Sequence, residues 1–352
     1  MSKNLRILFV HKNPCARAYK EAVALTGLGH SIDIACEKND QHPDITQYID
    51  TIYKYADYDQ LAEIIRKDCW DIVHCHNEPN MPTVVATQNA SNCPVVYDCH
   101  DVTGLRQQLD PERRENERRC FEESDGVIMV TNTLVDVISK RYNVDNIIAL
   151  PCYCLVENVP RVQRKKLPGN HLVYQGMILD SGIHPLEYRN YYPFFKAMVE
   201  KGIHVHVYCS IFNPKVLSSY IHLDQSTTFF HFHQQVPYEQ LLDELGQYQW
   251  GLAAFNIEDI HEKDKLLFLN SILPNKLFDY IFSGACPIVM NNATAGKWCE
   301  KHGVGYHVHS LDEMLDVLLN SPPIAPVDDL SLISMEKHIR AVEEFYFKLL
   351  QE

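Results

Sequence analysis

Short apolar runs alternate with helical segments along almost the whole chain, and this alternation limits the fold more than any other feature. A short apolar run reads as a buried strand, whereas a longer segment with apolar residues three and four apart reads as a helix. The first half of the chain has predicted strands at 6–10, 31–36, 72–76, 94–99, 126–130 and 147–150, and predicted helices at 16–28, 58–67, 82–90, 112–123 and 133–142. This order predicts a doubly wound α/β sheet.

The second half repeats the pattern after a polar break. Residues 160–170 lack apolar periodicity and contain Pro160, Pro168 and Gly169, so we interpret them as a linker. Beyond them lie predicted strands at 171–176, 205–209 and 251–255, predicted helices at 192–201 and 238–248, and a long amphipathic helix at 334–351. A chain of 352 residues has room for two cores. We predict two Rossmann-like domains, residues 1–160 and 170–333, and a C-terminal helical segment at 334–352.

Charge and hydropathy exclude several classes of protein. A net charge of −14 argues against general nucleic-acid binding, because a polyanionic partner requires a basic surface. No apolar run approaches the ~20 residues that a membrane-spanning helix needs. Met1 to Leu5 lead directly into a strand without a signal peptide, so we expect a cytoplasmic protein.

Most of the twelve cysteines lie in apolar runs and are predicted to be reduced core residues rather than disulfides or metal ligands. Those in apolar runs are Cys36, Cys75, Cys93, Cys99, Cys209 and Cys286. The runs Cys152-Tyr153-Cys154 and His74-Cys75-His76 lack the paired Cys-x₂-Cys spacing of structural zinc sites, and alternate residues of a strand are expected to face opposite ways. No metal site is therefore predicted.

Residues 273–289 combine a loop, a short helix, a glycine turn and a buried strand. Pro274 is expected to start the helix, whose first free N–H groups attract anions. Asp279 lies one turn further on and can accept hydrogen bonds from sugar hydroxyls, and Gly284 permits the turn into the strand. An anion and a polyol would therefore meet here, as they do in a nucleotide sugar.

This stretch resembles the donor-site motif of GT-B glycosyltransferases, a Pro-x-Lys-Leu-Phe-Glu-Tyr run followed by a small-residue turn and Pro-Val. Three further segments, Asp71–Asn80, Pro94–Asp101 and Ser124–Thr131, resemble landmarks of the retaining, glycogen-synthase-like group of that fold, which includes glycosyltransferase family 4. The resemblance spans nearly the whole chain. It implies two Rossmann-like domains facing each other across a cleft, with the acceptor side in residues 1–160, the donor side in 170–333 and the C-terminal helix crossing back to the first domain.

The resemblance implies donor contacts on the second domain. Asp279 matches the carboxylate that holds the ribose hydroxyls, Lys276 would contact the pyrophosphate, and two neighbouring residues would offer backbone N–H groups. The predicted donor-binding residues are Asp279, Lys276, Asn275, Leu277, Gly176, Arg189 and Ser271.

Two departures from the family pattern concern this donor side. Ser271 stands where many members have a glutamate that grips the transferred sugar. The loop after Gly176 lacks the usual arginine and lysine, and the candidate replacements are Arg189, Lys215, Lys263 and Lys265. The sugar contact and the diphosphate contact are therefore both predicted to differ from the family pattern.

On the first domain, the resemblance makes His100 the residue that faces the transferred sugar, at the carboxyl end of a strand. Asp101 is grouped with it and is expected to orient the loop. His76, Asn77 and Glu78 follow the preceding strand and could line the acceptor cleft or serve only the loop. The first loop, with Lys12 and Asn13 among the predicted acceptor-side residues, lacks the family's glycine pair.

The implied reaction is transfer of a hexosyl group, with retention of configuration, from a nucleotide sugar to a glycan or a lipid-linked acceptor in cell-surface polysaccharide synthesis. The donor would be UDP- or GDP-linked, and no cofactor or metal is expected. Basic residues on helix 112–123 and in the linker could give weak peripheral association with the inner face of a membrane: Arg113, Arg114, Arg118, Arg119, Arg161, Arg164, Lys165 and Lys166.

Two other functions remain open. A nucleotide-sugar epimerase or hydrolase can share this two-domain architecture. A catalytically silent module that binds a nucleotide or a partner is favoured by Ser271 and by the few cations at the expected phosphate position.

Overall fold

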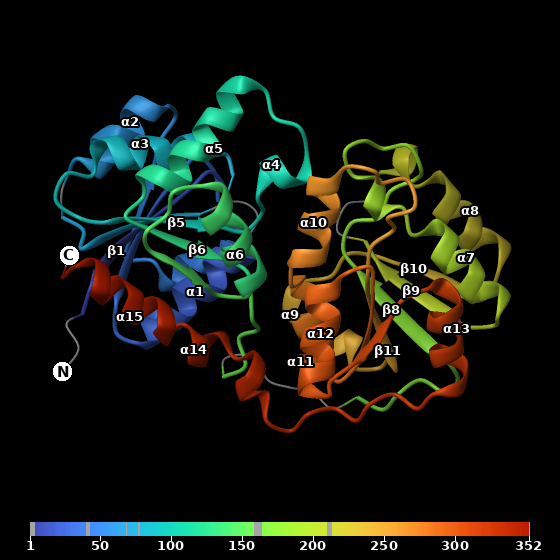
Figure 1. Cartoon of the computed structure of the whole chain (residues 1–352). Helices are drawn as coiled ribbons and strands as arrows, with labels where there is room; N and C mark the ends of the chain where they lie inside the picture. Colours follow the sequence, from blue (N-terminus) through green and yellow to red (C-terminus); the bar gives the residue numbers. More distant parts are fainter. Residues whose placement is uncertain are drawn as a thin grey trace. The chain divides into compact units, whose positions relative to one another are not determined.

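The computed structural model describes residues 4–39, 43–67, 69–76, 78–157, 164–209 and 213–351 (Figure 1). The chain divides into two compact units. The N-terminal unit comprises residues 1–157 and 334–352, and the C-terminal unit comprises residues 158–333. Within the described residues, no helix is long and apolar enough to span a membrane.

The N-terminal unit is built on a parallel sheet, which has seven strands among the described residues, in the order β3-β2-β1-β4-β5-β6-β7. The strands are β1 Arg6–His11, β2 Ser31–Cys36, β3 Thr51–Lys54, β4 Ile72–His76, β5 Val95–Cys99, β6 Gly126–Met129 and β7 Ile147–Ala149. The helices are α1 Ala16–Gly27, η1 Pro43–Tyr48, α2 Tyr58–Ile65, α3 Met81–Asn89, α4 Thr103–Arg106, α5 Pro111–Glu123, α6 Asn132–Arg141, α14 Met335–His338 and α15 Arg340–Leu349. In Figure 1, α2, α3 and α5 cover one face of this sheet, and α1 and α15 cover the other.

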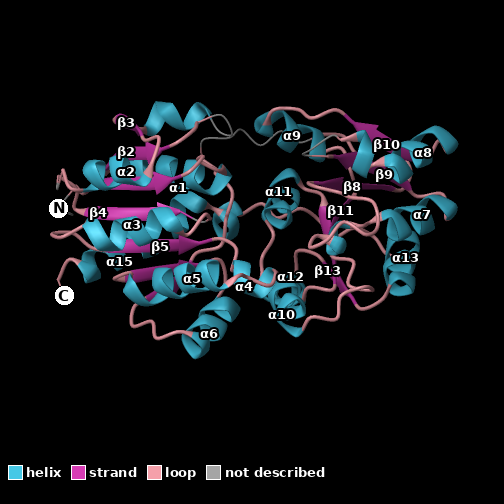
Figure 2. Ribbon diagram, turned by 90° about the horizontal axis from the view of Figure 1, so that it is seen from above, coloured by secondary structure: helices cyan, strands magenta, loops and turns pink. Residues whose placement is uncertain are grey.

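The C-terminal unit has a second parallel sheet, with six strands among the described residues, in the order β10-β9-β8-β11-β12-β13 (Figure 2). The strands are β8 His171–Gln175, β9 His204–Tyr208, β10 Phe230–His233, β11 Trp250–Ala254, β12 Cys286–Met290 and β13 Tyr306–Val308. The helices are η2 Glu187–Arg189, α7 Tyr192–Glu200, η3 Pro214–Val216, α8 Ser218–Ser226, α9 Tyr238–Leu245, α10 Lys263–Ser271, α11 Asn275–Ser283, α12 Ala293–His302, α13 Leu311–Asn320 and η4 Leu330–Ile333.

The prediction of two doubly wound α/β sheets is confirmed, and three local expectations are corrected. The segment between residues 255 and 273, for which the sequence predicts only a polar loop, contains α10. The C-terminal helix is interrupted at Ile339, between α14 and α15. Pro274 caps α11 from outside rather than occupying its first turn.

The cysteine prediction holds with one exception. All twelve thiols are free, and five of the six predicted core cysteines are buried, whereas Cys93 is partly exposed. Cys93 lies in the turn before β5, where the chain is not yet inside the sheet. The buried thiols pack with aliphatic and aromatic side chains in the cores of the two units.

The C-terminal segment completes the N-terminal unit. Buried Tyr346 of α15 contacts His74 through its hydroxyl, and Glu343 Oε1 lies 3.1 Å from His30 Nε2. The helix approaches the sheet so closely that a Cβ at Gly126 would lie 2.6 Å from Phe345 Cζ. Glycine at position 126 therefore permits the docking of α15.

A ladder of histidines crosses three strands of the C-terminal sheet. His171 Nδ1 lies 2.9 Å from His206 Nε2, His206 Nδ1 lies 2.9 Å from His233 Nε2, and His204 Nδ1 lies 3.0 Å from His231 Nε2. Rings on neighbouring positions stack with centroids 4.3–5.3 Å apart. Side chains two residues apart share one face of a strand, which is why these histidines meet.

Acidic groups from two helices act on this ladder. Burial and the neighbouring histidines lower the pKa values of His231 and His233, and Asp224 of α8 offsets part of this lowering at both residues. Glu244 of α9 also offsets part of it at His233. The lowering is large at the centre of the ladder. Burial, followed by the charges of the neighbouring histidines, lowers the pKa of His206 to about 2.

His206 should therefore make unfolding sensitive to acid. Its pKa is lower in the folded protein than in the unfolded chain, so the unfolded state takes up the proton first as the pH falls below about 6.5. We expect the free energy of unfolding to fall by about 2 kcal/mol from this group between pH 6.5 and 5. Urea unfolding of the native protein and of His206→Gln at both pH values measures this loss. The exposed His222→Gln control should retain it, and an unchanged slope in His206→Gln would contradict the assignment.

Candidate functional site

Both sheets reverse their strand order next to the first strand of the unit. The reversal lies between β1 and β4 in the N-terminal unit and between β8 and β11 in the C-terminal unit. Open parallel sheets bind ligands at the carboxyl ends of their strands at such a reversal. The predicted functional residues that the structure describes are best considered at these two edges, one unit at a time.

Two cations lie near the carboxyl end of β8. Lys276, in the first turn of α11, has its Nζ 3.7 Å from the centroid of the Tyr174 ring. Burial and the nearby charge of Arg189 lower the pKa of Lys276 well below its usual value, and Asp279 offsets only part of this. Arg189 is itself held beside Tyr188 at 5.3 Å. The fold thus places two basic side chains close to a helix N-terminus, where the charge of Arg189 disfavours a proton on Lys276.

Gly176 makes room for this arrangement. It has φ of 120°, in the region that favours glycine, and its N–H donates to the Tyr208 carbonyl oxygen at 3.0 Å. A Cβ at this position would lie 3.3 Å from Lys276 Nζ. Any larger residue would be strained and would press on the lysine.

Asp279, three residues after Lys276 on α11, is buried rather than open to solvent. Its Oδ2 accepts a hydrogen bond from Gln175 Nε2 at 2.7 Å, and its Oδ1 accepts one from the Tyr238 hydroxyl at 2.6 Å. The carboxylate therefore joins the end of β8 to the start of α9. Its role toward ribose hydroxyls stays a prediction.

The other predicted donor-side residues have different settings. Asn275 is exposed at the start of α11, and Leu277 is buried in the core. Ser271 ends α10 and is buried, with its hydroxyl donating to the Leu267 carbonyl oxygen at 2.6 Å. Among the alternative cations, Lys265 lies 3.1 Å from a carboxylate oxygen of Glu187, so its charge is already balanced.

In the N-terminal unit, His100 follows β5 and contacts two charged groups. Its Nε2 lies 3.1 Å from Asp98 Oδ2, and its Nδ1 lies 3.7 Å from Cys15 Sγ at the start of α1. Burial lowers the pKa of His100, but Asp98 and the Cys15 thiolate raise it more, to about 10. His100 therefore carries a positive charge at neutral pH.

Asp98 is the centre of a buried ion-pair network. Arg17 Nε lies 2.7 Å from Asp98 Oδ2 and 2.9 Å from Glu21 Oε1, with all three side chains at most 3% exposed. Burial raises the pKa of Asp98, but Arg17 and His100 lower it to a value well below normal, so this carboxylate stays ionised. Burial and the charge of Asp98 raise the pKa of Glu21 well above its usual value, and Arg17 offsets part of this effect.

His74 and His76 complete this network, and their placement corrects the expectation that they face opposite ways. Residues two apart on a strand share a face, and their rings stack at 4.3 Å. With Glu21 and Asp98 they are close enough to surround a cation. The Arg17 guanidinium already supplies positive charge there, so we interpret the group as an ion-pair network. His76 is 3% exposed and lies inside this network.

The loops after β4 and β5 are held together by Arg106. It donates to Asp101 Oδ2 at 3.1 Å and to both carboxylate oxygens of Glu78 at 3.2 and 3.3 Å, and Glu78 also accepts from the Thr103 hydroxyl. Asp101 is thus bonded within the loop region that it was expected to orient. Asn77 lies outside the described residues.

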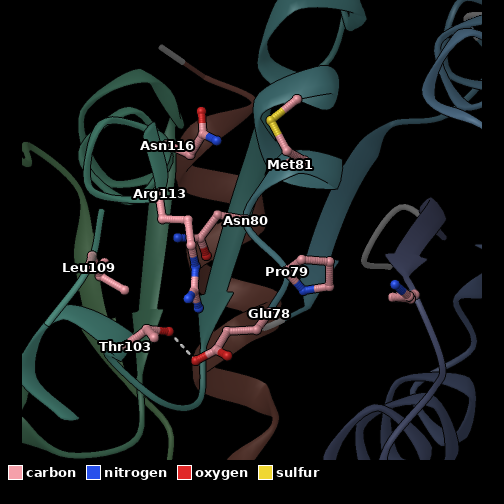
Figure 3. Close-up of a pocket in the computed structure, with 9 residues that line it drawn as sticks. Glu78, Pro79, Asn80, Met81, Thr103, Leu109, Arg113 and Asn116 are labelled. Atoms are coloured by element: carbon pink, nitrogen blue, oxygen red, sulfur yellow. Dashed lines mark hydrogen bonds between the residues drawn. The ribbon is translucent and has the colours of Figure 1, made fainter. Parts of the chain in front are cut away.

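A pocket of about 360 Å³ opens beside these loops (Figure 3). Figure 3 shows the Arg113 side chain extending from α5 toward Glu78. The predicted acceptor-side residue Lys12 also contributes, whereas Asn13 uses its backbone N–H to bond His11 Nδ1 at 3.1 Å. The pocket is lined by Lys12, Glu78, Pro79, Asn80, Met81, Thr103, Leu109, Arg113 and Asn116.

Sequence reasoning missed most of the buried partners of these residues. Arg17, Lys20 and Glu21 are charged residues at helical spacing among the buried residues of α1, and Asp98 is a charge inside an apolar strand. Both patterns are signals of buried pairing, because isolated charges are costly in a core. Gln175 and Tyr238 carry no comparable signal, since each is polar at the end of its element.

The two Rossmann-like units define the GT-B class of fold, which solved structures share. A glycosyltransferase from Rickettsia africae ESF-5 aligns with a TM-score of 0.66 at 14% identity, covering 100% of both chains. AviGT4, a glycosyltransferase involved in avilamycin A biosynthesis, aligns at 0.60 and 12% identity over 99% of this chain and 98% of its own. A putative UDP-N-acetylglucosamine 2-epimerase from Listeria monocytogenes aligns at 0.59 and 11% identity over 98% and 97%.

A family model also matches part of the N-terminal unit. Residues 17–152 match the family model described as Glycosyltransferase Family 4. The chain therefore has the GT-B fold, and residues 17–152 of its N-terminal unit resemble glycosyltransferase family 4, as the sequence motifs indicated. Among curated proteins, none matches the sequence.

Removal of Arg17 should destabilise the N-terminal unit strongly. Arg17→Met leaves the Asp98 carboxylate buried with less compensating charge, and breaking a buried pair in this way costs about 3–5 kcal/mol. Urea unfolding measures the loss. Arg118→Met is the matched control, because Arg118 forms ion pairs only at the surface of α5 and should change stability little. Equal stabilities of the two variants would contradict a network centred on Arg17.

Proposed function

We propose that the protein transfers a sugar from a nucleoside diphosphate sugar, with the diphosphate bound at the start of α11. The observation that carries this proposal is the pair of buried basic side chains Lys276 and Arg189. Burial and the charge of Arg189 lower the pKa of Lys276, and Asp279 offsets only part of this effect. A diphosphate would relieve the repulsion between the two side chains. The free backbone N–H groups at the N-terminus of α11 also favour the binding of an anion.

The chemistry that this arrangement supports is stabilisation of a leaving phosphate. When the bond from the anomeric carbon to the diphosphate breaks, negative charge grows on the phosphate oxygens. Lys276 and Arg189 would neutralise this charge. The aromatic rings of Tyr174 and Tyr188 lie against these two side chains and would position them before the reaction. The reaction is proposed to retain anomeric configuration, as the resemblance implies.

The acceptor is proposed to be a glycan, bound at the pocket of the N-terminal unit. Its mixture of amides, a hydroxyl, a carboxylate and the exposed Arg113 suits a ligand rich in hydroxyl groups. A hexosyl group, a UDP- or GDP-linked donor, a lipid-linked acceptor and a role in surface polysaccharide synthesis belong to the same proposal, which rests on resemblance for these details.

Weak peripheral membrane association is less favoured by the observed pairing of basic residues. Arg118 and Arg119 pair with glutamates on their own helix, and Arg164 pairs with Asp243. Lys166 donates to two backbone carbonyls at 2.7 Å. Among the basic groups that the structure describes, few are therefore free of other partners, and Arg161 lies outside the described residues.

A second candidate is a nucleotide-sugar epimerase or hydrolase. The observation that favours it is the fold similarity to a protein described as a putative UDP-N-acetylglucosamine 2-epimerase. A silent nucleotide-binding module is the third candidate, because Ser271 is engaged inside its own helix.

Nucleotide binding should depend on Lys276. A ligand that binds only the folded protein stabilises it, by about 2.7 kcal/mol at a concentration of 100 times Kd. We expect UDP or GDP to raise the melting temperature of the native protein, and Lys276→Met to weaken binding about tenfold or more because one charge-assisted contact is lost. Without ligand, this variant should be no less stable, since a buried cation is removed. Exposed Lys196→Met is the matched control.

The outcomes separate the three functions. Nucleotide binding followed by sugar transfer to an added glycan supports the transferase. Loss or conversion of the nucleotide sugar without an acceptor supports the epimerase or hydrolase, and binding without turnover supports the silent module. If no nucleotide shifts the melting temperature, the site at α11 is wrong.

A further inference from the structure

Cys15 differs from the other cysteines of the chain in position and surroundings. It is the residue immediately before the twelve-residue helix α1, and it is partly exposed. Nine cysteines are buried, and the remaining two that reach solvent are Cys69 and Cys93. A thiolate before a helix N-terminus is favoured by the free N–H groups of the first turn.

A chain of alternating charges leads from Cys15 into the core. The Cys15 sulfur lies 3.7 Å from His100 Nδ1, and His100 Nε2 lies 3.1 Å from Asp98 Oδ2. Asp98 is in turn paired with Arg17 at 2.7 Å. The imidazole is thus fixed by a buried carboxylate on one nitrogen and presents the other to sulfur, which is the arrangement that activates a nucleophile.

We propose that Cys15 is a modification site, a nucleophilic thiol that forms a mixed disulfide with low-molecular-mass disulfides. The thiolate sulfur attacks one sulfur of the disulfide and forms a new S–S bond as the old S–S bond breaks. The other half leaves as a thiolate and takes a proton from solvent. Cys15 is oxidised in this step, and the released half is reduced.

The electrostatics of the site agree with this geometry. Burial raises the pKa of Cys15, but the charge and hydrogen bond of His100 and the second imidazole of His11 lower it more, to well below the usual value. His100 is protonated at neutral pH, as described above. Cys15 is therefore a thiolate at pH values where an ordinary thiol remains protonated.

Modification would also affect the site around His100. The added group lies against an imidazole that resemblance places at the transferred sugar. This consequence rests on the proposed function, whereas the reactivity of Cys15 does not. Sugar transfer should fall as Cys15 is modified and should return when a reducing thiol is added.

The test is the rate of reaction with an aromatic disulfide that releases a coloured thiol. Peptide mass spectrometry assigns the modified cysteine. At about pH 5 only a very small fraction of an ordinary thiol is ionised, whereas a thiol with a lowered pKa is ionised to a larger extent. A thiolate of lower pKa is also a weaker nucleophile, but this reduces the rate advantage of Cys15 only in part. We expect Cys15 to react about tenfold faster than Cys69 at about pH 5, and its rate to depend less on pH between about 5 and 8 than that of an ordinary thiol.

Variants separate the contributions. Cys15→Ser should remove the fast phase, and Cys69→Ser should leave it unchanged. His100→Gln should slow the reaction at low pH and restore a steep pH dependence. If Cys15 reacts no faster than Cys69 at low pH in the unmodified chain, the proposal is overturned, and this result needs no variant and no sugar substrate. A fast Cys15 in His100→Gln would overturn the role of the imidazole.

Discussion

The N-terminal unit depends on the neutralisation of one buried carboxylate. Asp98 lies in the middle of a parallel sheet, where an unpaired charge would be too costly to keep. Arg17 offsets that cost from the neighbouring helix, and the same contact fixes the start of α1 relative to β5. Because His100 also contacts Asp98, the orientation of the His100 ring beside Cys15 follows from a contact in the core of this unit.

The C-terminal unit handles charge in the opposite way. At the end of β8, the chain keeps Lys276 and Arg189 close together with incomplete compensation, and it holds them with aromatic faces instead of carboxylates. A bound anion, such as the diphosphate proposed above, would offset this positive charge. The network around Asp98, in contrast, has its charges paired within the protein.

Local sequence patterns predicted most strands of the two sheets and the α11 corner, because these are encoded by contiguous residues. The short strands β3, β10 and β13 were not predicted. The segment 263–271 was not recognised as a helix, since its polar residues obscure the apolar periodicity. The network around Asp98 could not be read directly because Arg17 and Asp98 are 81 positions apart. Similarly, the partners of Asp279 come from two other elements, and a motif of neighbouring residues does not specify them.

The docking of α15 on the first sheet has a consequence for synthesis. Residues 334–352 are made only after the whole C-terminal unit, yet they supply Tyr346 and Glu343 to the N-terminal unit. During translation, the part of the first sheet around His74 and Gly126 therefore lacks its contacts with α15 until α15 leaves the ribosome. The second unit, which is continuous in sequence, can complete its core earlier.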